Sequence, residues 1–125
     1  MAVDVDRWLE SQFAASGPFT ALIILVKIES TTIWPLGSSY ATVIGSDLRW
    51  AGMRRLLDDS RLSWSGVAIF PAFSEAGGPL TDEGARHRLA EVQKRVIADH
   101  AAINEGFFFD HLGRMIRLEE VVPSS

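Results

Sequence analysis

The sequence contains no cysteine and no long apolar run, and each absence excludes a class of protein. Without cysteine there is no disulfide framework, no thiolate nucleophile and no cysteine-based zinc or iron–sulfur site. The most apolar run, residues 19–26, is much shorter than the roughly 20 residues of a transmembrane helix. The first residues are acidic where an export signal would be basic. We therefore expect a cytoplasmic protein with no membrane partner.

Positive charge is also scarce. Twelve Lys and Arg residues face 16 Asp and Glu residues, which gives a formal net charge of −4. Proteins that coat duplex nucleic acid need the opposite balance, because they neutralise phosphates. The chain does have 125 residues and 47% hydrophobic content, which is enough to bury a core without disulfides or a structural metal. We expect a single α+β domain spanning residues 1–125.

The hydrophobic periodicity predicts the element order α-β-β-α-β-α-β-β. We expect a helix capped by Asp4 or Asp6 that ends at Gly17, a second helix capped by Ser46 or Asp47 that ends at about residue 60, and a third helix capped by Thr81 that ends at about residue 104. Strands are expected at residues 19–29, 40–44, 64–70, 107–109 and 114–122, with a polar connection at residues 30–39. Because strand–helix–strand units favour parallel crossovers, we predict a single mixed sheet of about five strands with helices packed on it.

Two of the predicted strands are apolar on both faces. The first half of the strand at residues 19–29 has this pattern, and so does the triplet Phe107, Phe108 and Phe109. Three helices do not suffice to cover both sides of such a sheet, so a second copy is expected to cover the remainder. We therefore predict a small non-catalytic protein that acts through protein–protein contact, as a homodimer or an assembly component.

The loop at residues 71–79 carries the alternative hypothesis. It is long for a simple connection, and Gly77 and Gly78 give it a hinge. Together with residues 45–47 it would follow the carboxyl ends of parallel strands, where ligands bind. The protein would then be a small-molecule enzyme or ligand-binding protein, with Glu75 as acid or base and His87 or Ser46 as its partner. No nucleophile, nucleotide or cofactor motif supports this, so the sequence favours a protein that is not an enzyme and has no cofactor.

A further set of residues stands out as possible contacts for a ligand or partner, either as large aromatic side chains or as loop glycines. These are Trp34, Phe73, Gly77, Gly78 and Phe108. The histidines have no metal-binding spacing, so no metal site is expected. His100 is expected on the core face of the longest helix as a buried imidazole.

The second alternative is RNA binding through the helix at residues 47–58. Arg49, Arg54 and Arg55 lie there, close to Trp50 and Trp64, which is the combination that holds single-stranded nucleic acid. However, Trp50 falls on the apolar stripe of this helix, and neighbouring aspartates dilute the positive charge. The pattern therefore favours a solvated helix face over a nucleic-acid site.

Overall fold

The computed structural model describes residues 3–29, 32–45, 49–99 and 105–116. Its elements are α1 (Asp4–Ser16), β1 (Phe19–Glu29), β2 (Thr32–Val43), α2 (Trp50–Asp59), β3 (Gly66–Ala72), α3 (Asp82–Ala98), β4 (Phe107–Asp110) and β5 (Met115–Ile116). The predicted α+β class and the predicted order of elements are confirmed. None of the described helices is long and apolar enough to span a membrane.

The five strands form a single sheet in the order β2-β1-β3-β4-β5, and every neighbouring pair is antiparallel. The predicted parallel pairings are therefore wrong. β2 and β3 do run in the same direction, as a crossover through α2 requires, but β1 lies between them and pairs with both. The strand–helix–strand pattern thus predicted the direction of these two strands correctly and their pairing incorrectly.

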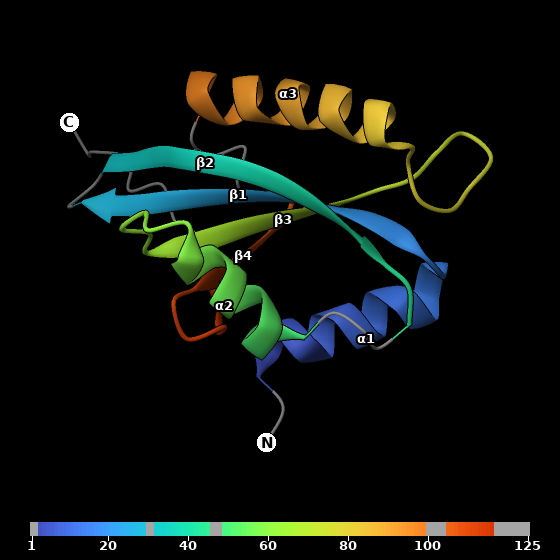
Figure 1. Cartoon of the computed structure of the whole chain (residues 1–125), viewed down its shortest axis with the longest axis horizontal. Helices are drawn as coiled ribbons and strands as arrows, with labels where there is room; N and C mark the ends of the chain where they lie inside the picture. Colours follow the sequence, from blue (N-terminus) through green and yellow to red (C-terminus); the bar gives the residue numbers. More distant parts are fainter. Residues whose placement is uncertain (1–2, 30–31, 46–48, 100–104, 117–125) are drawn as a thin grey trace, which may run out of the picture.

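Both faces of the sheet are covered by helices of the same chain. α3 lies on one face, and α1 and α2 lie on the other (Figure 1). Along β1 the residues alternate: Phe19, Ala21, Ile23 and Leu25 pack toward α1 and α2, whereas Leu22, Ile24 and Val26 pack toward α3. The aromatic triplet divides in the same way, with Phe109 toward α1 and α2 and Phe108 toward α3. The expectation that three helices leave an apolar sheet face uncovered is wrong for the described residues.

β2 is much longer than predicted. It begins at Thr32 rather than Tyr40, so that most of the expected polar connection is in fact strand. The strand contains Pro35 and a register shift opposite Leu25 and Val26, both of which an edge position tolerates. Trp34 is consequently a strand residue paired with Lys27 rather than a loop residue.

The acidic first turn of α1 holds other elements in place. Asp4 and Asp6 were expected to cap their own helix, but the residue before α1 is Val3, which makes no side-chain cap. Asp6 Oδ1 instead accepts a hydrogen bond of 2.7 Å from the Trp50 N–H, the first amide of α2. Asp4 Oδ2 accepts one of 2.8 Å from the Met115 N–H of β5. The predicted caps of α2, Ser46 and Asp47, lie outside the described residues.

The long helix α3 agrees with its predicted start and apolar face. The Gly84 N–H donates to Thr81 Oγ1 at 3.1 Å, which confirms the predicted cap. Ala85, Leu89 and Val96 are buried against the sheet. The helix ends at Ala98, earlier than predicted, and His100 lies outside the described residues. The β4–β5 hairpin is confirmed as far as Ile116.

Candidate functional site

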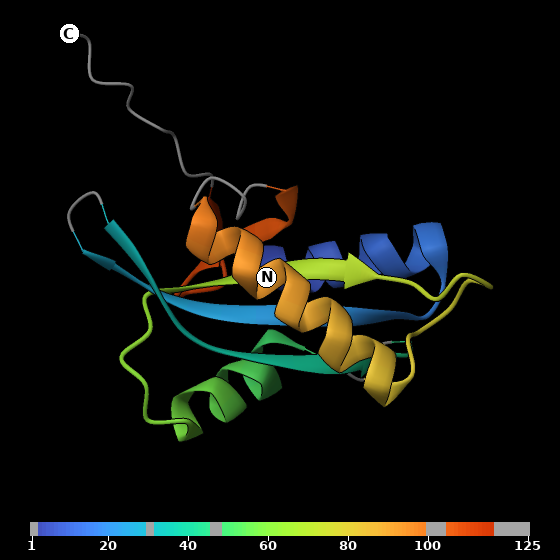
Figure 2. The ribbon, with the colours of Figure 1, turned by 90° about the horizontal axis from the view of Figure 1, so that it is seen from above.

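One edge of the sheet is open. β2 stands last in the strand order, and none of the backbone hydrogen bonds outside the regular elements of the described residues reaches it. Seen from above, β1 and β3 follow β2 in turn across the sheet (Figure 2). The backbone groups on the outer side of this 12-residue strand therefore have no strand partner among residues 3–29, 32–45, 49–99 and 105–116.

The sequence of β2 gives this edge little protection. Natural edge strands are commonly blocked by charged side chains, prolines or bulges, which prevent pairing with another chain. β2 has no charged residue at all, and Pro35 and the register shift affect only its first half. From Gly37 to Val43 the strand has neither charge nor proline, and Ser38, Ser39 and Thr42 are exposed. This second half has the composition of an edge that accepts a partner strand.

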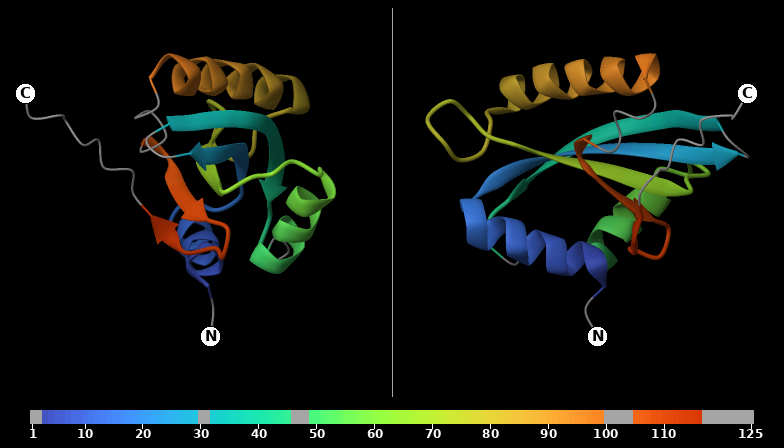
Figure 3. Two further views of the ribbon diagram at one scale, coloured as in Figure 1. Left: turned by 90° about the vertical axis from the view of Figure 1, so that its left-hand side faces the viewer. Right: turned by 180° about the vertical axis from the view of Figure 1, so that it is seen from behind.

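The opposite edge has a different environment. In the part of the chain that the structure describes, β5 covers Met115 and Ile116, and the Met115 N–H donates to Asp4. Asp110 ties the hairpin together: Oδ1 accepts from the Leu112 and Arg114 N–H groups at 2.9 Å each, and Oδ2 accepts from Arg114 Nε at 2.7 Å. Partial burial acts to raise the pKa of Asp110, but these hydrogen bonds outweigh it and lower the pKa below its ordinary value. Figure 3 shows this hairpin beside the start of α1.

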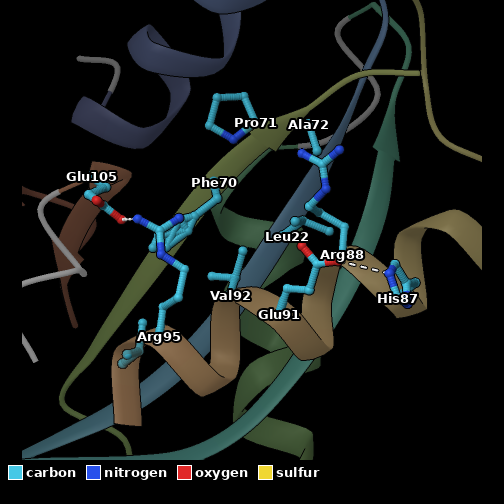
Figure 4. Close-up of a pocket in the computed structure, with 11 residues that line it drawn as sticks. Leu22, Phe70, Pro71, Ala72, His87, Arg88, Glu91, Val92, Arg95 and Glu105 are labelled. Atoms are coloured by element: carbon cyan, nitrogen blue, oxygen red, sulfur yellow. Dashed lines mark hydrogen bonds and ion pairs between the residues drawn. The ribbon is translucent and has the colours of Figure 1, made fainter. Parts of the chain in front are cut away.

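A second candidate site is a cavity of about 370 Å³ between α3 and β3. α3 packs mainly on β1 and β2, which leaves room between the helix and β3. The floor is apolar and includes Leu22, Phe70, Ala72 and Val92, whereas the rim is charged. Arg88 and Arg95 extend from α3 across the cavity toward β3 (Figure 4). A space of this kind, with apolar side chains on one part of its lining and charged groups on another, can hold a small ligand.

The charged rim residues differ in their partners. His87 Nε2 lies 2.8 Å from Glu91 Oε1, and the Arg95 guanidinium forms an ion pair with Glu105. Arg88 has no ion pair or hydrogen bond from its side chain within the described part of the chain. Among the rim arginines of the described residues, Arg88 is therefore the one whose guanidinium is not already paired with a carboxylate.

The residues proposed for catalysis are not brought together. His87 lines the cavity, but its carboxylate neighbour is Glu91 rather than Glu75. Glu75 is exposed on the loop after β3 and does not line the cavity. Gly77 and Gly78 have φ values of +87° and +80°, so this loop uses glycine for a left-handed turn. Ser46 lies outside the described residues. The parallel-strand edge on which this hypothesis relied does not exist, because neighbouring strands are antiparallel.

The predicted contact aromatics have different environments. Trp34 is 53% exposed on β2, which leaves it available to a partner. Phe73 packs against the apolar cluster between the sheet and helices α1 and α2, and its ring centroid lies 6.2 Å from that of Phe19. Phe108 is only 2% exposed, so the expectation that it contacts a partner is wrong: its own chain covers it.

The arginines of the predicted basic patch are largely neutralised. Arg49 Nη1 lies 2.6 Å from Glu10 Oε1, and this hydrogen bond raises the pKa of the arginine. Arg54 Nε lies 3.7 Å from Asp58 Oδ2, whereas Arg55 is exposed. Trp50 is buried against Trp64, with ring centroids 6.0 Å apart, and offers no face for base stacking. The described residues therefore do not form a basic stacking surface.

Sequence reasoning missed the rim arginines and the open edge. Arg88 and Arg95 are seven residues apart, which is about two helical turns, so both lie beside Val92 on one side of α3. The spacing therefore predicts that the two arginines share one side of the helix. It does not predict the gap between α3 and β3 that they border. No protein-family model, curated protein or solved structure matches this chain.

Proposed function

We propose that this protein is non-catalytic and acts through protein–protein contact, as a homodimer joined by its β2 edges. The observation that carries the proposal is the open, uncharged half of β2 from Gly37 to Val43. Backbone groups on a free strand edge bind another strand by main-chain hydrogen bonds, the mode known as β-augmentation. The proposed contact is at the edge of the sheet, because its faces are covered by α1, α2 and α3.

A second copy of the chain is the partner that this strand suits. Two β2 strands related by a two-fold axis run antiparallel, so each residue meets a residue of the same short segment. Such a pairing needs a segment that does not repel itself, and Gly37–Val43 carries no charge. Its residues are mostly small, including Ser38, Ser39 and Ala41, which lets the two edges approach closely. The result is one continuous sheet built from two five-stranded sheets.

The alternatives have less support. RNA binding would need free arginines and stacking aromatics, but Arg49 and Arg54 are ion-paired and Trp50 is buried. Catalysis at the loop after β3 would need Glu75 to meet His87, and Glu75 does not line the cavity. A cytoplasmic location is part of the proposal and rests on the sequence alone; fractionation of cells that express the protein would test it.

Light scattering after size exclusion, over a series of protein concentrations, tests the proposal. We expect a dimer mass for the natural chain at high concentration. Thr42→Lys places a charged side chain on the edge, and Ser39→Pro removes a backbone donor, so both variants should elute as monomers. Ala90→Lys, at an exposed position of α3, is the control and should remain a dimer. A natural chain that stays monomeric at every concentration would overturn the proposal.

A further inference from the structure

We infer that the cavity between α3 and β3 binds a small carboxylate that carries a hydrocarbon body. This inference goes beyond the protein contact proposed above and does not depend on it. The cavity measures about 370 Å³, near the lower end of the sizes that hold small ligands. It therefore suits a compact molecule rather than a nucleotide-sized one.

The floor of the cavity determines the body of the ligand. Leu22, Phe70, Ala72 and Val92 come from β1, β3 and α3 and contribute apolar side chains to the lining. Pro71, between Phe70 and Ala72 on β3, also lines the cavity. Burying hydrocarbon here is favourable by the ordinary hydrophobic effect, and the Phe70 ring suits an aromatic group.

The rim determines the charge of the ligand. The Arg95 guanidinium already binds Glu105, and Glu91 already faces His87. Arg88 is left with five N–H donors and no acceptor among the described residues. A guanidinium with free donors matches a carboxylate, which it binds through two parallel hydrogen bonds.

The same rim disfavours a dianion. Glu91 and Glu105 lie on the cavity wall, and their carboxylates would repel a phosphate with a double negative charge. A monoanion can pair its single charge with Arg88 while its apolar body packs on the floor. It is repelled less by Glu91 and Glu105 than a dianion would be. The chemistry that fits is therefore an arylalkyl or short alkyl carboxylate.

Titration of the natural chain with 4-phenylbutyrate, followed through its amide NMR spectrum, tests this inference. We expect saturable shifts centred on Ala72 and Val92, with a Kd in the micromolar-to-millimolar range that a ligand of this size allows. The neutral amide of the same acid should bind about tenfold more weakly or worse, because it lacks the charge-assisted hydrogen bonds to Arg88.

Two variants complete the experiment. Arg88→Gln should weaken 4-phenylbutyrate binding by about tenfold or more, because it removes the guanidinium. Arg86→Gln is the matched control: it lies on the same helix, is exposed, does not line the cavity and should bind as the natural chain does. Absence of shifts in the natural chain, equal binding of acid and amide, or an Arg88→Gln variant that binds normally would each overturn the inference. Because Arg88 faces the cavity beside β3 rather than the outer side of β2, the oligomeric state of this variant should be unchanged, which keeps the two proposals separable.

Discussion

The two edges of the sheet differ in length, charge and hydrogen bonding. As far as the structure describes it, to Ile116, β5 has two residues, lies in a hairpin held by Asp110 and donates its Met115 N–H to Asp4 of α1. β2 has 12 residues and no charge, and no described strand lies on its outer side. The chain thus uses side chains from a remote helix to close one edge and leaves the other open. An open edge allows pairing with another strand, and the proposed homodimer places that pairing at β2.

Forcing the β4–β5 hairpin away from α2 should lower the free energy of unfolding. Gly113 has a φ of +79°, and a Cβ there would lie 2.8 Å from Trp50 Nε1. We expect Gly113→Ala to lower the free energy of unfolding by about 2–4 kcal/mol, from backbone strain and overpacking together. Urea denaturation measures the loss. Gly52→Ala, which meets nothing within 4 Å in α2, is the control and should be neutral or stabilising. Equal unfolding midpoints for the two variants would contradict this account.

Substitution of Asp110 should cause the next largest loss of stability. Asp110→Asn removes the charge that accepts from Arg114 and Leu112, and we expect a loss of about 1–2 kcal/mol at neutral pH. Because the folded-state pKa of Asp110 lies below its ordinary value of 3.8, its ionised form stabilises the fold above that value. This contribution disappears as the pH falls through the folded-state pKa.

Urea denaturation of both proteins at several pH values checks this prediction. The difference between the natural chain and Asp110→Asn should shrink as the solution is acidified below about pH 4. Asp59→Asn, at an exposed aspartate of α2, should show no such convergence. A difference that stays constant, or grows, on acidification would contradict the proposed role of Asp110.

Loss of the hydrogen bond from the Trp50 N–H of α2 to Asp6 of α1 should destabilise the fold less. Asp6→Ala removes the acceptor of the Trp50 N–H, and loss of a helix cap typically costs about 1 kcal/mol. Asp6→Asn keeps an oxygen at the same place and should lose less. Thermal unfolding of the three proteins ranks them, and an Asn variant that is as unstable as the Ala variant would show that the hydrogen bond is not what matters.

Changes at the open edge should hardly affect the folded monomer. Thr42 is exposed on β2, so Thr42→Lys should change the free energy of unfolding by less than about 0.5 kcal/mol at a concentration where the chain is monomeric. The same substitution should abolish the dimer. If Thr42→Lys unfolded the monomer instead, β2 would be structural rather than an interface.

The sequence predicted the core better than the edges. The alternation of Phe19 to Val26 and the spacing of Ala85, Leu89 and Val96 follow from burial, which dominates in the middle of the sheet. The first half of β2 was missed because Pro35, Gly37 and the serines are typical of a connection, and an edge strand tolerates them. Local patterns do not encode which strands become neighbours, so the insertion of β1 between β2 and β3 could not be predicted.

The candidate sites could be predicted only in part. Trp34 was identified as a possible contact and is exposed, whereas Phe108 was expected at a surface and is buried by α3. Arg88 and Arg95 were visible as a helical pair, but the cavity beside them depends on where α3 crosses the sheet. That crossing is a property of the packed tertiary structure, because ridges and grooves of the whole interface determine it.

Amide hydrogen exchange at low and high protein concentration tests the central claim most directly, since it observes both edges in one sample. We expect exposed amides between Gly37 and Val43 to become protected as the concentration rises, because β2 then pairs with its copy. The Met115 amide, already bonded to Asp4, should exchange at the same rate at both concentrations. A β2 edge whose amides exchange equally fast at every concentration, in a chain that remains folded, would contradict the claim.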